Sequence, residues 1–262
     1  MTATDLGGED RRVVCWFSAG AASAVATKLA LATYGPEQCV VASIDPGSEH
    51  PDNERFLLEC EEWFGVPIVR LKSEKYVDTW QVFEERRYLV GPAGALCTAE
   101  LKKKLRYLFE RPDDLQVFGY TAEEVKRADR FREQNPGVDL ATPLIEHGLT
   151  KGDCLSMIDR AGIELPEMYR LGYRNNNCIG CVKGGMGYWN KIRVDFPETF
   201  DRMAKLEREL GHTVLRDKDG AVWLDELDPS RGNYSAEKVE ECGVTCSTAE
   251  EIIEPTKVEI RT

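Results

Sequence analysis

The chain has 262 residues, enough for one large α/β domain or two small ones. Its composition, 42% hydrophobic and 31% charged, is typical of a globular protein, and no stretch approaches the roughly 20 apolar residues that a membrane span needs. The first twelve residues lack the apolar core of a secretory signal. We therefore expect a cytoplasmic protein with no membrane partner. The net charge of −12 argues against a nucleic-acid partner, RNA included, because proteins that bind polyanions are usually basic.

Residues 1–145 alternate short apolar runs with helical patterns. Uninterrupted apolar runs are typical of strands buried on both faces, and we expect such strands at residues 12–17, 39–44, 68–71 and 115–118. Helices are expected after the first run as far as residue 33, at residues 54–64, and from about residue 121. Strands that alternate with helices predict a parallel α/β sheet with right-handed crossovers. This part of the chain is the predicted nucleotide-binding half.

Residues 146–262 differ in composition and form the predicted cysteine-bearing half, which we expect to pack with the first half as one unit. The stretch 173–189 is polar and rich in glycine, which favours a loop. Flanking patterns predict two helices and a hairpin, at residues 149–163, 197–211 and 212–227. The predicted fold class is thus α/β, a parallel-sheet nucleotide-binding domain with a C-terminal helical and hairpin extension that carries cysteines.

A loop of small residues, Ser18-Ala-Gly-Ala-Ala-Ser23, joins the first expected strand to the first expected helix. Small residues let backbone N–H groups approach an anion, and the start of a helix adds favourable partial charge. The hydroxyl groups of Ser18 and Ser23 can donate hydrogen bonds as well. The sequence therefore favours a phosphate site at Ser18, Gly20 and Ser23, with an ordinary strand-to-helix turn as the alternative.

This loop resembles the S-G-G-x-D-S loop of the PP-loop, or adenine nucleotide alpha hydrolase-like, superfamily, with Ala19 and Ala22 where that pattern has Gly and Asp. ATP-cleaving members use that Asp around the magnesium–pyrophosphate end of ATP. The relaxed pattern is more similar to the PAPS and APS reductase branch, which binds an adenine nucleotide without splitting ATP. The resemblance implies a Rossmann-like fold of the PP-loop type.

Further segments resemble the same reductases in the same order along the chain. Residues 45–54 are similar to their D-T-G-x-x-F-P-E-T segment, and residues 119–124 to a G-x-R-x-x-E segment with Thr121 where Arg is expected. Residues 143–172 are similar to the stretch that leads into the family's cysteines. The resemblance implies that an adenine nucleotide (ATP, APS or PAPS) is contacted beyond the small-residue loop by Asp45, Gly47, Thr121 and Glu124.

The nine cysteines differ in their sequence context. The absence of an export signal argues against disulfides, and four cysteines among apolar neighbours are expected in the core: Cys15, Cys39, Cys60 and Cys154. Cys178 and Cys181 form a C-x-x-C motif among glycines. Two thiolates at this spacing can bind one metal centre, act as a redox dithiol or form half of a zinc site. Three cysteines remain, Cys97, Cys242 and Cys246.

The resemblance also implies roles for these cysteines. Iron–sulfur APS reductases have a cysteine pair near the position of Cys97, which implies a [4Fe–4S] cluster on Cys97, Cys178 and Cys181, with three thiolates or with a fourth from Cys246. The E-C-G sequence around Cys242 resembles the reductase tail whose cysteine attacks the substrate's sulfur, so Cys242 is the expected nucleophile. A zinc site of four thiolates and purely structural thiols are the alternatives.

Three functions remain open on these features. The first is an oxidoreductase acting on sulfur-group donors, similar to PAPS reductase, with a thioredoxin-type or other electron donor. The second is an ATP-dependent sulfur transferase of RNA or nucleobases with a three-cysteine cluster, for which the missing acid at Ala22 and the negative charge are unfavourable. The third is a non-catalytic nucleotide-binding module with a four-cysteine zinc site.

Two further groups of side chains are expected to be structural. The basic run at residues 102–104 is expected to be a solvated helix face, with contact to a phosphate as the alternative. Tyr188 and Trp189, which follow the glycine run, are expected to pack against a helix rather than to stack on a base.

Overall fold

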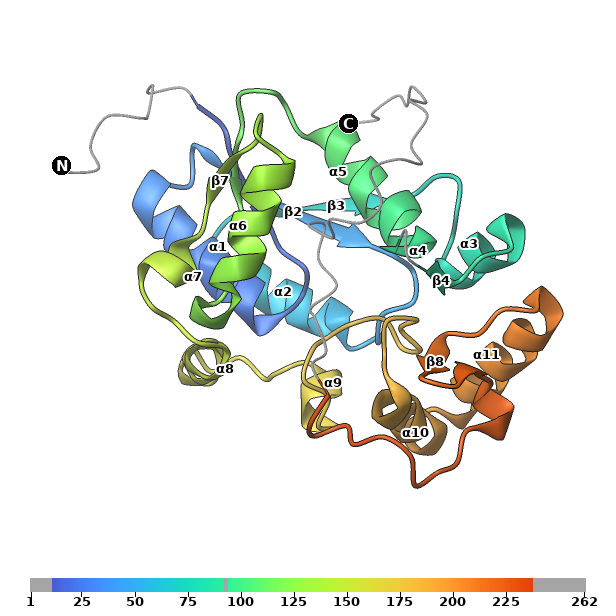
Figure 1. Ribbon diagram of the computed structural model, residues 1–262. Helices are drawn as coiled ribbons and strands as arrows, with labels where there is room; N and C mark the ends of the chain where they lie inside the picture. Colours follow the sequence, from blue (N-terminus) through green and yellow to red (C-terminus); the bar gives the residue numbers. More distant parts are fainter. Residues whose placement is uncertain (1–10, 92–93, 238–262) are drawn as a thin grey trace. The chain divides into compact units, whose positions relative to one another are not determined.

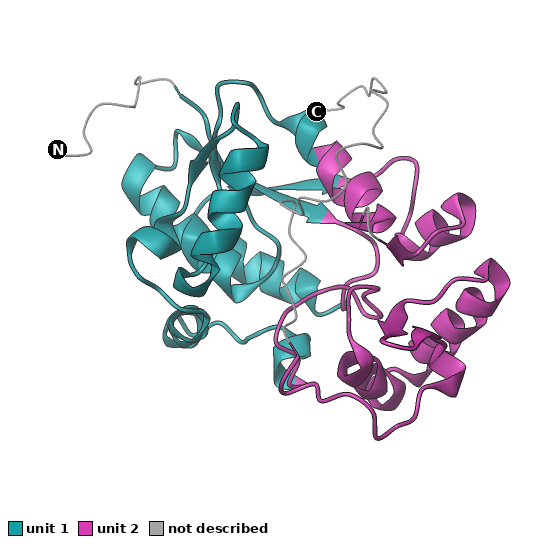
Figure 2. Ribbon diagram, viewed as in Figure 1, with its two compact units in different colours: residues 1–44, 51–71, 106–170 teal, residues 45–50, 72–105, 171–262 magenta. Residues whose placement is uncertain are grey.

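The computed structural model of the protein describes residues 11–91 and 94–237 (Figure 1). The chain divides into two compact units of interleaved segments (Figure 2). Unit 1 consists of residues 1–44, 51–71 and 106–170. Unit 2 consists of residues 45–50, 72–105 and 171–262. The boundary expected after residue 145 falls within unit 1, inside helix α7 (Pro143–Glu146).

The β-sheet matches the parallel arrangement predicted from the alternating pattern. Within the described residues it has five strands in the order β3-β2-β1-β6-β7. These strands are β1 (Val13–Trp16), β2 (Cys39–Asp45), β3 (Ile68–Lys72), β6 (Leu115–Val117) and β7 (Asp139–Ala141). β1 pairs in parallel with β2 and β6, and β6 pairs in parallel with β7. β1 is therefore the central strand, and the strand order reverses between β1 and β6.

The helices described in unit 1 are short to medium in length. They are α1 (Ala21–Tyr34), α2 (Asn53–Phe64), α5 (Lys104–Phe109, which the division crosses), α6 (Val125–Gln134), α7, α8 (Lys151–Arg160) and α9 (Glu167–Arg170), with the 3-10 turn η2 (Ala122–Glu124). α2 ends at Gly65, whose positive φ of 76° is the left-handed conformation that stops many helices. α8 begins at the capping box that Thr150 and Asp153 form.

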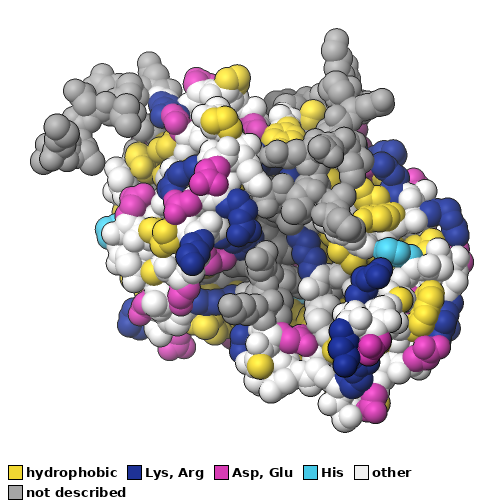
Figure 3. Space-filling model, viewed as in Figure 1, with side chains coloured by type: hydrophobic (Ala, Val, Ile, Leu, Met, Phe, Trp, Pro, Cys, Tyr) yellow, Lys and Arg dark blue, Asp and Glu magenta, His cyan; other side chains and the backbone are white. Residues whose placement is uncertain are grey.

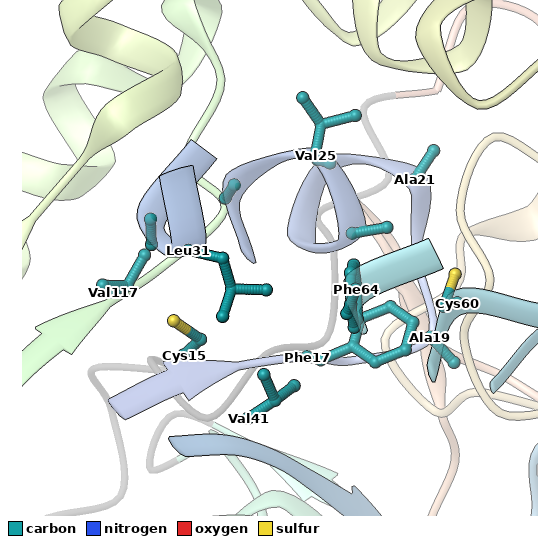
Figure 4. Packing of buried hydrophobic residues seen from close by; sticks show 14 of the residues in the cluster. Cys15, Phe17, Ala19, Ala21, Val25, Leu31, Val41, Cys60, Phe64 and Val117 are labelled. Atoms are coloured by element: carbon teal, nitrogen blue, oxygen red, sulfur yellow. The ribbon is translucent and has the colours of Figure 1, made fainter. Parts of the chain in front are cut away.

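Both faces of β1 are buried, as its uninterrupted apolar sequence predicts. Cys15 and Phe17 lie in a hydrophobic cluster that includes side chains of α1, α2 and α8 (Figure 4). Trp16 packs edge to face on Phe109 of α5, with ring centroids 5.8 Å apart. Successive residues of a strand point to opposite faces, so helices cover both sides of the sheet.

The four cysteines expected in the core are there. All four are buried: Cys15, Cys39, Cys60 and Cys154. Burial raises the pKa of Cys60, so its thiol stays protonated and behaves as a small apolar group. The core expectation is thus confirmed for this set.

Unit 2 contains short elements and two longer helices. Its described elements are α3 (Thr79–Arg86), β4 (Val90–Gly91), β5 (Gly94–Ala95), α4 (Leu96–Thr98), the π-helix η1 (Ala99–Lys103), α10 (Met186–Asp195), α11 (Pro197–Leu210), β8 (Leu215–Asp217), β9 (Gly220–Val222) and η3 (Leu224–Glu226). α10 packs against α11. α11 ends at Gly211, as expected, and β8 and β9 form the expected hairpin.

One expectation about the elements is wrong, and one strand of the parallel sheet was not expected. The loop expected over residues 173–189 stops earlier, because α10 begins at Met186. Tyr188 and Trp189 therefore lie on a helix, and both are buried there, which confirms that they are packing residues. Strand β7 was not expected, because its three residues carry no alternating or continuous apolar pattern.

The surface carries charges of both signs. On the face drawn in Figure 3, Lys and Arg side chains lie interspersed with Asp and Glu side chains. Among the charged side chains of the described residues are exposed ion pairs, such as Arg208 with Asp225 (2.7 Å) and Arg132 with Asp129 (3.1 Å). Pairs of this kind contribute little to stability. Among the helices within residues 11–91 and 94–237, none is both long and apolar enough to cross a membrane.

Candidate functional site

The loop between β1 and α1 brings Ser18 and Ser23 together. The Ser23 hydroxyl accepts a hydrogen bond from the Ser18 backbone N–H (3.1 Å), lies 3.0 Å from the Ser18 hydroxyl oxygen and donates to the carbonyl of Gly20 (2.9 Å). These bonds close the loop at the start of α1, whose first turn has no acidic residue. The carboxyl ends of β1 and β6, where the strand order reverses, are the position at which open α/β sheets bind ligands.

Two backbone features show how tightly this loop is built. A Cβ atom at Gly119, just beyond β6, would lie 2.7 Å from the backbone N of Ser23. A residue with a side chain would therefore clash with the start of α1, and glycine is required at position 119. Ala19 has a φ of 54°, in the left-handed region that costs a residue with a Cβ atom about 1–2 kcal/mol. Strain of this type recurs at ligand-binding loops.

Ala22 occupies the position where the PP-loop pattern has Asp. Its side chain is 1% exposed and belongs to the hydrophobic cluster of unit 1. A carboxylate there would be enclosed by apolar atoms, at a cost of several kcal/mol unless it were paired. The loop therefore offers hydroxyl groups and a helix N-terminus to an anion, and no acid at this position for a magnesium ion.

Tyr169 of α9 reaches the same loop. Its hydroxyl lies 3.4 Å from the backbone N of Ala21, the first residue of α1. The segment around Tyr169 is held by Asp52, which accepts a hydrogen bond from the Glu167 N–H (2.8 Å) and pairs with Arg55 (2.8 Å). The Arg55 hydrogen bonds lower the pKa of Asp52, so the carboxylate stays charged at neutral pH.

Thr121 and Glu124 form a capping box at the start of η2. The Glu124 carboxylate accepts from the Thr121 N–H (3.2 Å), and the Thr121 side chain bonds in return to the backbone of Glu124. Glu124 also pairs with Arg127 (2.6 Å). In this structure both side chains bond to the chain's own groups, and their contact with a nucleotide stays a prediction.

Asp45 and Gly47 shape a tight turn in unit 2. One oxygen of Asp45 accepts from the Gly47 N–H (2.7 Å), and the other pairs with Lys72 (3.0 Å). Gly47 has a φ of 71°, and a Cβ atom on it would lie 1.9 Å from the carbonyl oxygen of Val77. Glycine is therefore required at position 47 for the chain to pass the residues that precede α3.

Ser48 links this turn to α3 and to the C-x-x-C motif. Its hydroxyl accepts from the N–H of Thr79 at the start of α3 (3.1 Å) and lies 2.8 Å from the Thr79 hydroxyl. Its carbonyl accepts from the N–H of Ile179, which lies between the two cysteines of the motif (2.9 Å). The turn that contains Gly47 and the C-x-x-C motif, which are far apart in the sequence, are thus joined in unit 2.

The expectation that residues 102–104 form a solvated face is wrong for Lys102 and Lys103, which are 6% and 2% exposed. Lys102 pairs with Glu49 (3.4 Å), and Lys104 pairs with Glu100, which is 4% exposed (2.6 Å). An acidic partner from within unit 2 allows the ammonium group of Lys102 to leave water, whereas the Lys104 side chain stays 27% exposed. The run lies on and next to the π-helix η1, a conformation often found at functional sites.

The C-x-x-C turn is closed by the hydroxyl of Tyr188. This hydroxyl accepts from the Cys181 N–H (2.9 Å) and donates to the Cys178 carbonyl (3.2 Å). Gly180 has a φ of 75°, and a Cβ atom there would lie 2.6 Å from Thr199 Cγ2. Burial, with a smaller effect of the Cys181 thiol, raises the pKa of Tyr188 well above its usual value, so the phenol stays protonated as a donor.

The described part of the C-terminal segment ends beside this turn. The Glu237 carboxylate accepts hydrogen bonds from the backbone N–H groups of Gly187 (2.6 Å) and Tyr188 (3.1 Å), which caps α10. A carboxylate at a helix N-terminus is favourable because of the unpaired N–H groups there. The expected nucleophile Cys242 and the expected ligand Cys246 lie outside the described residues.

The three other cysteines expected to bind a cluster, Cys97, Cys178 and Cys181, all belong to unit 2. Helix α4, which carries Cys97, packs on α3, and a Cβ atom at Gly180 would lie 3.8 Å from the Trp80 ring of α3. Among the residues that the structure describes, no three Cys, His, Asp or Glu side chains gather closely enough to hold a metal ion. The C-x-x-C pair suits two ligand positions of a thiolate-bound metal, but the described side chains do not complete the set.

A comparison with sequence models of known protein families finds no match, and a search of curated proteins finds none either.

The contacts of three residues in these sites were not expected from the sequence. Tyr169 was noted only as part of the reductase-like run, and Tyr188 only as a packing residue. Glu237 carries no local signal, because it is one of 46 acidic residues and follows no motif. The spacing of Tyr188 after the C-x-x-C motif and its glycines is the signal that could have pointed to its contact with the turn.

Proposed function

We propose that the protein is an enzyme that binds an adenine nucleotide and acts on a sulfur group, in the manner of PAPS and APS reductases. The observation that carries the proposal is the hydroxyl pair of Ser18 and Ser23 at the start of α1. Hydroxyl groups, backbone N–H groups and a helix N-terminus at the strand-order reversal form a phosphate site in many α/β proteins. Ser18, Gly20 and Ser23 would hold the nucleotide's phosphate.

The proposed substrate is an adenine nucleotide with an activated sulfur group, such as APS or PAPS. A thiolate, assigned to Cys242, attacks the sulfonyl sulfur, and the bond from that sulfur to the phosphate oxygen breaks, which releases the nucleotide. A thiol of a thioredoxin-type donor then attacks the cysteine sulfur, releasing sulfite and leaving a mixed disulfide. The second thiol of the donor frees Cys242 as a thiolate. Cys242 follows the anchored Glu237 by only five residues.

The cofactor part of the proposal is a [4Fe–4S] cluster on Cys97, Cys178 and Cys181, with a further ligand such as Cys246, and zinc is the alternative. None of the steps above requires the metal. Thiolate ligands suit both iron–sulfur clusters and zinc, so the donor type alone does not decide between them. The absorption spectrum of anaerobically purified protein, with iron, sulfide and zinc assayed on the same sample, distinguishes the two.

Nucleotide binding tests the proposal directly. Calorimetric titration with APS, PAPS, AMP and ATP, followed by an assay for sulfite with a thioredoxin-type donor, is expected to show binding and sulfite release with APS or PAPS. The absence of binding by all four nucleotides would contradict the proposal at its base. Binding without sulfite release would contradict the reductase chemistry and leave a nucleotide-binding module.

An ATP-dependent sulfur transferase is the second candidate, and the buried position of Ala22 weighs against it. Such an enzyme would convert ATP to AMP and pyrophosphate in the presence of RNA or a nucleobase. We expect no such turnover. A colourless protein that holds one zinc ion and releases no sulfite would favour the third candidate, the non-catalytic zinc module.

A further inference from the structure

Tyr188 bonds with its two ends to different parts of unit 2. Its hydroxyl lies between the Cys181 N–H (2.9 Å) and the Cys178 carbonyl (3.2 Å), at opposite ends of the C-x-x-C turn. Its backbone N–H donates to the Glu237 carboxylate (3.1 Å). A displacement of Glu237 therefore acts on the residue whose side chain closes the cysteine turn.

Packing leaves Tyr188 little freedom to move independently. The residue is 3% exposed, and its ring contacts the rings of Tyr173, Trp189 and Tyr234 at centroid distances of 5.9, 5.7 and 6.3 Å. A Cβ atom at Gly184 would lie 1.9 Å from the Tyr188 ring, so the glycine run before α10 passes directly over it. Tight packing transmits a shift at one end of the side chain to the other.

We name residues 228–237 the C-terminal arm. The arm lies against the start of α10, where a Cβ atom at Gly232 would come within 2.2 Å of the Gly187 backbone N. Arg174, four residues before Cys178, donates its backbone N–H to the Tyr234 hydroxyl (2.8 Å) and its guanidinium to the Glu237 carbonyl (2.9 Å). The arm thus contacts the segment that leads into the cysteine turn as well as the residue that closes it.

We propose that Tyr188 is a positioning residue for Cys178 and Cys181, and that docking of the C-terminal arm through Glu237 sets the position of Tyr188 and hence of the two thiols. The proposal deepens the proposed function, because it takes the cysteine pair as a reactive or ligating site. The positioning role itself does not depend on nucleotide binding. The C-terminal arm thus controls the geometry of the cysteine pair, so a change at Glu237 alters the positions of two thiols that Glu237 does not contact.

The test measures the two thiols in the nucleotide-free full-length protein. Alkylation of Cys178 and Cys181 by iodoacetamide is followed separately by mass spectrometry, with Cys97 as internal reference. Cadmium(II) is titrated in parallel, and the thiolate-to-cadmium charge-transfer absorption reports the fit of the pair to a soft metal. The variants are Tyr188→Phe, Glu237→Ala and Glu237→Gln, the last of which keeps one oxygen acceptor. Tyr173→Phe is the matched control, since it removes a neighbouring buried hydroxyl that makes no hydrogen bond to any described residue, the turn included.

In the Tyr188→Phe variant, we expect iodoacetamide to alkylate both cysteines at least fivefold faster than in the parent. We expect the affinity of this variant for cadmium to be about tenfold lower. Glu237→Ala is expected to change both quantities two- to threefold in the same directions, with Glu237→Gln in between and Tyr173→Phe equal to the parent. A response to Tyr188→Phe without one to Glu237→Ala would overturn the control by the arm. Unchanged alkylation and absorption in both variants would overturn the whole proposal.

If Tyr188→Phe does not fold, the partly exposed Glu237 carries the test through its Ala and Gln variants. If the protein binds no nucleotide and yet the thiols respond as expected, the proposed function fails and the positioning role of Tyr188 stands.

Discussion

The hydroxyl oxygens of Ser18 and Ser23 lie 3.0 Å apart, yet the two side chains have different surroundings. Ser23 is 5% exposed and bonds to the backbone of both Ser18 and Gly20, so it holds the loop in shape. Ser18 is more exposed, at the carboxyl end of the central strand. The pair thus combines a residue that fixes the loop with a more exposed residue, which the proposed function assigns to the nucleotide's phosphate.

Ser18→Ala is expected to weaken nucleotide binding five- to tenfold while changing the free energy of unfolding by less than about 0.5 kcal/mol, because the proposed phosphate site loses one of its hydroxyl donors. Calorimetric titration and urea unfolding measure the two effects. Ser156→Ala, which removes an exposed serine hydroxyl on α8, is the matched control and should change neither. Equal affinities for Ser18→Ala and the parent would contradict the phosphate site.

Substitutions at Ala19 test the left-handed conformation of the loop. Ala19→Gly relieves about 1–2 kcal/mol of backbone strain. It also removes a buried methyl group worth about 0.8 kcal/mol and increases the conformational entropy of the unfolded chain. The net change in the free energy of unfolding should therefore stay below about 1 kcal/mol. Ala19→Val should destabilise by about 2–4 kcal/mol, because a branched side chain in this conformation also overfills the core. Thermal unfolding of the two variants compares them, and equal destabilisation would contradict the strained geometry.

Asp52→Asn should reduce the free energy of unfolding by about 1–3 kcal/mol at pH 7, because Asp52 loses its ion pair with Arg55. The pKa of Asp52 is lowered in the folded protein, so its stabilisation is complete above the unfolded value near 3.9 and is lost as the pH falls through the folded value. The difference between parent and variant should therefore be constant above about pH 5 and shrink below about pH 4. Urea unfolding across this pH range measures it.

An exposed pair provides the control for this prediction. Asp129→Asn breaks a pair with Arg132 in which both side chains are about half exposed, so its effect should stay below about 1 kcal/mol. A difference between parent and Asp52→Asn that is the same at pH 3 and pH 7 would show that the charge of Asp52 does not carry the effect.

The ion pair of Lys102 and Glu49 should be strongly coupled, because the two side chains are 8% and 13% exposed. Lys102→Met should destabilise by about 3–5 kcal/mol, since the Glu49 carboxylate then lacks its lysine partner in a poorly hydrated place. Lys102→Met combined with Glu49→Gln should cost clearly less than the sum of the single changes. The same cycle on the half-exposed pair Arg202 and Glu84 should give a coupling below about 1 kcal/mol.

The sheet and most helices could be predicted because each depends on a local pattern. The continuous apolar run of β1 reflects burial on both faces, and Gly65 and Thr150 mark helix ends through their own backbone and side-chain preferences. Strand β7 and the early start of α10 could not be predicted in this way. β7 is defined by pairing with β6, and Glu237, far along the chain, caps α10.

In the candidate sites too, contacts between residues close in sequence could be predicted, and contacts between residues distant in sequence could not. Ser18 and Ser23 are close in sequence, and their contact follows from a tight turn. The burial of Lys102 depends on Glu49, which is distant in sequence, so composition alone suggested a solvated position. Charge runs are usually solvated, and they become buried only where the fold supplies carboxylates that no local pattern reveals.

The π-helix Ala99–Lys103 has a consequence for how related chains can differ in length. A π turn closes its hydrogen bond over one residue more than an α turn, so it is equivalent to a single-residue insertion in an α-helix. Losing a residue within Ala99–Lys103 would restore α-helical geometry and keep Leu96 and Lys104 on their present faces. A deletion elsewhere in a helix would rotate every later residue by about 100°. Homologous chains are therefore expected to gain or lose a residue here without disturbing the packing on either side.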